Sequence, residues 1–159
     1  MQRIFWLAAA TLIVAACSSG PPTPGDPRAF EAVCDKSDDG KRIAVEGYLR
    51  LPETIEVITN RRGGDSTQLL VVRLFQSQTF NGTPIGVNFD FGSSANTIDQ
   101  LPTPQYTDKD LKVHLADGGT ASYGQRVRIS GAVYFPVTAL TNADVDFTCG
   151  LDNPLVEVL

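Results

Sequence analysis

Oxygen-bearing side chains recur at short intervals between Asp35 and Glu46. Asp35, Ser37 and Asp39 alternate along the chain, a glycine and Lys41 follow, and Glu46 comes five positions after Lys41. Calcium is a hard cation that takes about six to eight oxygen ligands, often from a tight loop. The spacing therefore predicts a calcium site, with carboxylates of Asp35, Asp39 and Glu46, the hydroxyl of Ser37 and the carbonyl of Lys41 as ligands.

The order of these residues resembles the calcium loop of EF-hand proteins, in which oxygen ligands fall at fixed positions around a central glycine. Two features depart from that family. Arg42 stands where the family has an apolar residue, and the alternation after Ile43, with Gly47, leaves no room for an exiting helix. The alternative is an acidic surface turn, because Asp-Asp-Gly is a strong turn signal by itself.

Other carboxylates come in alternating pairs that could support hydrolysis. Asp144 and Asp146 would point to the same side of a strand, which suits a cation or acid–base chemistry, and Asp108 and Asp110 follow the same pattern in a loop. Solubility is the competing explanation. The single histidine, His114, alternates with apolar residues and is expected on the polar face of a strand. No complete catalytic set is recognisable, so we expect a non-catalytic protein, with an envelope hydrolase as a lesser alternative.

The amino-terminal segment has the pattern of an export signal. Arg3 is followed by an apolar run, Ile4 to Ala16, that ends in small residues. A charged start, a short apolar run and small residues at the cut site are typical of a secretory signal peptide, and the run is shorter than the roughly 20 residues that span a bilayer. Residues 1–16 are therefore predicted to be a signal peptide.

Cys17 directly follows this run, and the segment resembles the lipobox of bacterial lipoproteins. The resemblance implies that signal peptidase II cuts after Ala16, that Cys17 receives a diacylglyceryl group, and that its amino group is acylated, with palmitate among the acyl chains. Two or three acyl chains would anchor the protein stably to the bacterial membrane. Ser18 rather than aspartate follows the cysteine, which favours the outer membrane where one exists. The alternative is a conventional signal-peptidase site.

The remaining cysteines, Cys34 and Cys149, form an even number in a chain predicted to be exported. This favours a disulfide bond between the two ends of the domain. Two buried free thiols are the alternative.

The net charge of the chain restricts its possible partners. The net charge is −5, and removing residues 1–16 leaves 12 basic and 18 acidic residues, a net charge of −6. This acidity disfavours nucleic acid as a partner and leaves the lipid to hold the protein on the membrane.

Residues 17–29 are rich in proline, glycine and serine and are predicted to be a disordered tether. Residues 30–159 are predicted to form a single domain.

Hydrophobic alternation with a period of two dominates this domain and predicts an all-β fold. Only residues 29–34 have a spacing that suggests one helical turn. The segment Ser93 to Asp110 is polar and rich in turn residues, so we expect a mobile loop or a binding surface. The predicted strands cover residues 43–51, 55–59, 69–75, 87–91, 111–115, 126–135 and 155–159, and a further extended stretch leads through residues 145–149.

Two of these strands share one layout, in which a glycine precedes polar residues, alternating apolar residues and a central glycine, Gly47 or Gly131. A glycine inside a strand permits the sharp bend of a small closed barrel. The layout resembles the first and fourth strands of OB-folds, which implies a small OB-like Greek-key barrel. A long segment between residues 81 and 110 departs from a minimal OB-fold and leaves a β-sandwich as the alternative.

These observations together predict a membrane-anchored lipoprotein of the bacterial cell envelope that acts as a non-catalytic binding or adaptor module. Its partner, an envelope protein or a small ligand, is expected to dock on the barrel face or on the Ser93–Asp110 loop. A calcium-dependent module and a hydrolase are the alternatives.

Overall fold

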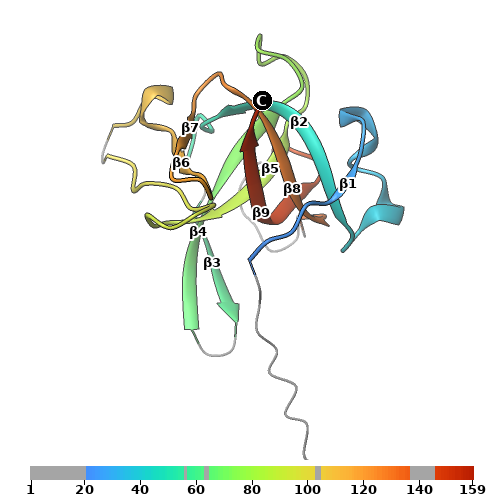
Figure 1. The fold of residues 1–159 in the computed structure, drawn as a ribbon, viewed down its shortest axis with the longest axis horizontal. Coiled ribbons are helices and arrows are strands. Elements are labelled where there is room, and N and C mark those ends of the chain that lie inside the picture. The colour runs from blue at the N-terminus through green and yellow to red at the C-terminus, as the bar shows by residue number, and fades with distance from the viewer. Residues whose placement is uncertain (1–20, 56, 63–64, 103–104, 137–145) are drawn as a thin grey trace, which may run out of the picture.

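The computed structural model describes residues 21–55, 57–62, 65–102, 105–136 and 146–159 (Figure 1). For residues 57–62 and 65–67 it describes the backbone only. Cys17 and the predicted signal peptide lie outside the described residues. Within the described residues, no helix has the length and apolar character needed to cross a bilayer.

Five strands form a closed ring. They are β2 (Arg42–Arg50), β4 (Asp65–Phe75), β5 (Ile85–Asp90), β8 (Arg126–Tyr134) and β9 (Gly150–Val158). The ring order is β2, β4, β5, β9, β8, and only the β5–β9 pair is parallel. Because β2 pairs with both β8 and β4, the sheet closes, so the predicted OB-like barrel is confirmed and the sandwich alternative is wrong.

The two glycine-centred strands, β2 and β8, are the first and fourth strands of the ring in chain order, and they pair with each other in antiparallel register. Gly47 lies where β2 begins to pair with β4, and a Cβ atom there would come within 2.5 Å of the carbonyl oxygen of Phe75. Only glycine permits this close approach. Gly131 lies at a register shift between β8 and β9, as expected for a bend.

Alternation along the strands fills the barrel with apolar side chains. Val45 and Leu49 of β2, Leu70 of β4, Phe89 of β5 and Ile129 of β8 are at most 1% exposed. The intervening residues face outward, so the outer surface of β2 and β8 carries the polar and charged side chains that matter below.

The remaining strands and turns lie outside the five-strand ring. β3 (Val57–Arg62) extends a hairpin with β4, and β6 (Lys112–His114) pairs with β7 (Thr120–Ser122), a strand that the sequence did not predict. Single 3-10 turns form at η1 (Phe30–Ala32), η2 (Lys36–Asp38) and η3 (Asp108–Asp110). The first of these lies within the predicted helical turn.

A two-residue strand, β1 (Asp26–Pro27), pairs in parallel with Ile43 and Ala44 of β2. β2 therefore has β1 on its edge at one end and β4 at the other (Figure 1). β1 belongs to the segment that was predicted to be a disordered tether. The ordered part of the domain therefore begins before Phe30, the first residue of the domain predicted from the sequence.

Candidate binding groove

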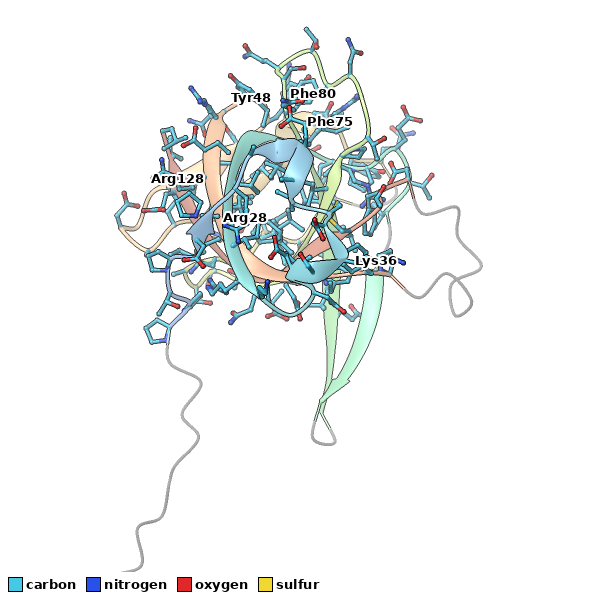
Figure 2. The ribbon with its side chains drawn as sticks, turned by 90° about the vertical axis from the view of Figure 1, so that its right-hand side faces the viewer. Arg28, Lys36, Tyr48, Phe75, Phe80 and Arg128 are labelled. Carbon is cyan, nitrogen blue, oxygen red and sulfur yellow. A yellow bond between two sulfur atoms is a disulfide. The ribbon has the colours of Figure 1, made fainter. Side chains whose placement is uncertain are left out.

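A groove of about 770 Å³ lies on the outside of the barrel, between β2, β8 and the amino-terminal segment. Residues 23–34, here called the strap, supply one wall through Pro24 to Phe30. The outward faces of β2 and β8 supply the floor. Figure 2 labels three residues that line this strap groove, Arg28, Tyr48 and Arg128.

Two arginines and a glutamate form the charged centre of the groove. Arg126 and Arg128 point to the same side of β8, and each donates a hydrogen bond of 2.7 Å to a different carboxylate oxygen of Glu46 on β2. In the strand register Glu46 lies opposite Arg128, and Arg128 lies opposite Glu157 of β9. The result is a ladder of alternating charges across three adjacent strands, which fixes the two guanidinium groups side by side.

The contacts within the ladder shift the pKa values of Glu46 and Arg128. The hydrogen bond from Arg128 holds the pKa of Glu46 below its ordinary value of 4.5, assisted by the charge of Arg126. The same bond raises the pKa of Arg128, and the nearby charge of Glu157 adds to that effect. Glu46 and Arg128 are therefore both ionised at neutral pH.

A buried hydroxyl lies beside the ladder. Ser130 follows Arg128 on the same face of β8 and lines the groove, yet its side chain is 0% exposed. Its Oγ atom has no hydrogen-bond partner among the residues that the structure describes. An unpaired hydroxyl away from water is costly, so this atom lowers the stability of the barrel at this point.

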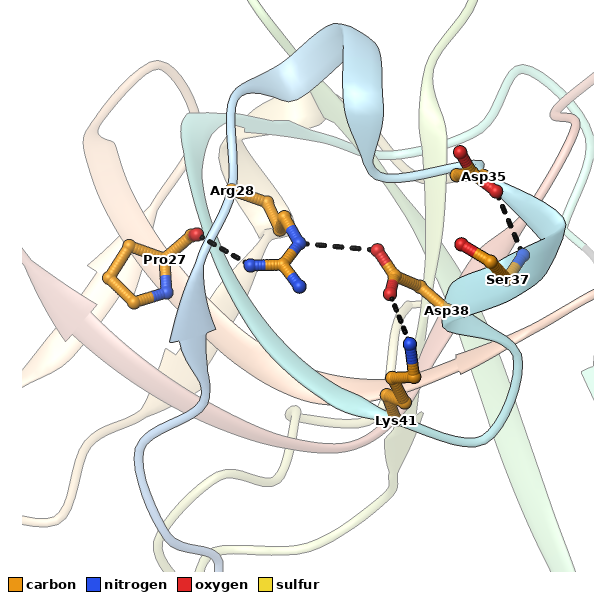
Figure 3. Close-up of polar contacts among 6 residues, drawn as sticks. All are labelled: Pro27, Arg28, Asp35, Ser37, Asp38 and Lys41. Carbon is orange, nitrogen blue, oxygen red and sulfur yellow. Dashed lines mark hydrogen bonds and ion pairs between the residues drawn. The ribbon is translucent and has the colours of Figure 1, made fainter.

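The strap is held in place by charged contacts at its centre (Figure 3). The Nε atom of Arg28 donates to Asp38 at 3.2 Å, and Nζ of Lys41 donates to the other oxygen of that carboxylate at 3.0 Å. The bonds from Lys41 and Arg28 hold the pKa of Asp38 below its ordinary value of 3.8. Near the start of the strap, the guanidinium of Arg42 donates to the carbonyl of Thr23.

The predicted disulfide is present and closes the strap at its far end. Cys34 is bonded to Cys149, across a sequence separation of 115. Cys149 immediately precedes β9, so the bond fixes the end of the strap to the barrel covalently.

Three of the five residues predicted as calcium ligands, Asp35, Lys41 and Glu46, make other contacts. Asp35 caps η2 by accepting from the backbone N–H of Ser37 at 2.8 Å, and Lys41 pairs with Asp38 (Figure 3). Glu46 lies on β2 and is held by the two arginines of β8 rather than turned toward Asp35 and Asp39. No group of three or more histidine, cysteine, aspartate or glutamate side chains in the described residues is arranged to hold a metal ion.

Three of the four carboxylates considered for hydrolysis have structural contacts. Asp146 accepts from Arg73 at 2.6 Å, whereas Asp144 lies outside the described residues. Asp110 bonds to Thr107 in a capping box, and Asp108 pairs with Arg50 at 3.3 Å.

His114 and the Ser93–Asp110 loop are tied together. The Nε2 atom of His114 lies 2.7 Å from a carboxylate oxygen of Asp99 in the loop, and Ile98 is fully buried in the core. The hydroxyl of Tyr106 donates to the carbonyls of Pro52 and Glu53. The described part of this loop, residues 93–102 and 105–110, is thus packed against the barrel.

The outer face of β4 and β5, where OB-folds commonly bind oligonucleotides, is covered by the protein's own chain. Arg73 of β4 is 3% exposed and lies against Asp146 and the ring of Phe147. The same ring packs over Gly86 of β5.

The groove residues Arg126, Arg128, Ser130 and Arg28 were not predicted from the sequence. The Arg-Val-Arg alternation in a predicted strand was a usable signal, because it places two positive charges on one face. The pairing with Glu46 and the strap was not visible, since it joins segments about 80 or more residues apart. No family model matches the chain, and neither a curated protein nor a solved structure matches it, so its function is inferred from this geometry.

Proposed function

We propose that the chain is a lipid-anchored protein of the bacterial cell envelope that acts as a non-catalytic binding or adaptor module, with the strap groove as its docking site. The observation that carries the proposal is the groove itself. It combines two arginines held by Glu46 with an ordered strap on the outside of the barrel. Recognition sites commonly combine a concave surface with a few converging polar groups.

The position of the strap supports the membrane-proximal part of the proposal. Seven positions separate Cys17 from Pro24, the first groove residue in the chain. An extended chain spans at most about 3.6 Å per residue, so the groove would lie within about 25 Å of a lipid on Cys17. A partner bound there would be held close to the membrane surface, which suits an adaptor that recruits an envelope protein.

Site-specific photo-cross-linking in intact cells tests the proposal. A photoreactive amino acid replaces Tyr48, which lines the groove, and in a matched control it replaces Lys109 of η3, which does not. We expect a stoichiometric protein partner to be recovered from position 48 only. The partner should be lost when Arg126→Gln and Arg128→Gln are combined. Absence of any product from position 48, or identical products from both positions, would contradict the proposal.

A further inference from the structure

The charges and shape of the strap groove restrict what it can bind. Each guanidinium carries five N–H donors in a planar fork that matches a carboxylate. Arg126 and Arg128 each direct one N–H to Glu46, and their side chains are still 57% and 44% exposed. The remaining donors are therefore accessible to a second carboxylate beside that of Glu46.

The charge balance of the lining favours a ligand with one negative charge. Arg28, Arg126 and Arg128 line the groove, and the carboxylates that line it are Glu46 and Glu157. The described lining thus carries one excess positive charge, on a chain whose net charge is −5. A single carboxylate would neutralise this excess, whereas a strongly acidic segment would be repelled by the two glutamates.

The walls suit an extended peptide. One wall is the strap, which includes β1 and presents Pro24, Pro27 and Phe30, so apolar contact is available along an extended path. The floor supplies the exposed guanidinium groups of Arg126 and Arg128 beside this wall. Polar groups in the floor and apolar groups in the wall together match a backbone with one acidic side chain.

We propose that the strap groove binds an extended segment of a partner protein through one carboxylate, which Arg126 and Arg128 clasp while the apolar residues of the strap contact the rest of the segment. This inference rests on the proposed function, because it names the chemical class of the partner at the same site.

Fluorescence anisotropy on the full chain in neutral detergent micelles tests this. The probes are two labelled, terminally blocked five-residue alanine peptides, one with a central glutamate and one with a central glutamine. We expect the glutamate peptide to bind about tenfold or more tightly, since hydrogen bonds to charged groups are the strong ones. Combining Arg126→Gln with Arg128→Gln should remove the difference between the peptides.

Two controls separate recognition from folding. Arg50→Gln alters an arginine that pairs with Asp108 outside the groove, so it should leave binding unchanged. Combining Arg126→Lys with Arg128→Lys keeps both charges but loses the planar forks, so it should retain only part of the preference. Melting temperatures of all variants show which of them are folded.

Equal binding of the two peptides, or a loss of binding in Arg50→Gln equal to that in the groove variants, would overturn the inference. Arginine-dependent binding of phosphatidylglycerol vesicles without binding of either peptide would also overturn it, in favour of a lipid phosphate. If cross-linking from position 48 still yields a partner while the peptides fail, the adaptor function stands and only the ligand class is wrong. If both experiments fail, both proposals fall.

Discussion

The guanidinium carbon of Arg73 lies 4.7 Å from the centre of the Phe147 ring. This contact joins β4 to the segment that precedes β9, and Asp146 adds an ion pair to the same arginine. The chain therefore packs its own aromatic ring on a face that other OB-like barrels leave open for ligands.

Replacing Phe147 by alanine should destabilise the protein. The ring is 6% exposed and fills the space above Gly86, so its loss leaves a cavity and removes the contact with Arg73. We expect the free energy of unfolding to fall by about 3 kcal/mol in urea denaturation. Leu159→Ala, at a side chain that is 52% exposed, is the matched control and should change it by about 0.5 kcal/mol or less. Equal effects would show that Phe147 does not pack as described.

Gly25→Ala should loosen the strap without unfolding the barrel. A Cβ atom at Gly25 would come closer to the backbone of Ile43 than any van der Waals contact allows, so β1 cannot stay paired with β2. We expect the amide of Arg28, which donates to Ala44, to exchange with solvent about tenfold faster or more. Gly92→Ala has ordinary room for its Cβ and should leave this rate unchanged.

Acid should release the centre of the strap. Hydrogen bonds from Lys41 and Arg28 hold the pKa of Asp38 below 3.8, its ordinary value. The stabilisation is therefore complete above that pH and is lost as the pH falls through the lowered pKa of the folded state. Asp38→Asn should be less stable than the unaltered protein at neutral pH. The difference between the two proteins in the free energy of unfolding, measured by urea denaturation down to about pH 2, should narrow only in acid. A gap independent of pH would contradict this account.

Calcium should not stabilise the protein. Glu46 is engaged by two arginines and Asp35 caps η2, so these carboxylates do not converge on one ion. A ligand bound only by the native state must raise the melting temperature. We therefore expect no shift in a calcium titration, and the same result for Asp39→Asn. A saturable rise that Asp39→Asn abolishes would restore the calcium loop predicted from the sequence.

Reduction of the disulfide should lower stability more than any single core substitution described here. The bond between Cys34 and Cys149 constrains a loop with a sequence separation of 115. The chain-entropy model assigns such a loop about 4 to 5 kcal/mol. Replacing both cysteines by alanine and measuring urea denaturation, with the oxidised and reduced forms of the unaltered protein alongside, checks this value. A change below about 1 kcal/mol would argue against the entropic account.

The barrel could be predicted from the sequence because its strands carry the pattern that closure requires. Alternating apolar residues identified β2 and β8, and the glycines at 47 and 131 marked where the strands bend. β9 was predicted only from residue 155, since Asp152, Asn153 and Pro154 are turn residues by type. In the structure these residues continue the strand next to the register shift, where Asn153 adopts a positive φ.

The groove could not be predicted because it depends on a segment with no strand pattern. Asp26 and Pro27 disfavour strands by type, yet β1 forms because β2 offers an unpaired edge and the disulfide holds the following residues nearby. The carboxylate of Glu46 was assigned to a metal because its partners, Arg126 and Arg128, lie far along the chain. Local spacing identifies candidate ligands, whereas tertiary pairing decides what they contact.

The disulfide also determines how the domain bears mechanical load. A pull applied between the two ends of the chain travels along the strap to Cys34, crosses the covalent bond to Cys149, and leaves through β9. Strands β2 to β8 lie inside the covalent loop, so this backbone path bypasses them. A pull between the two ends can therefore lengthen the chain only through the strap and β9, because the disulfide keeps residues 34–149 closed.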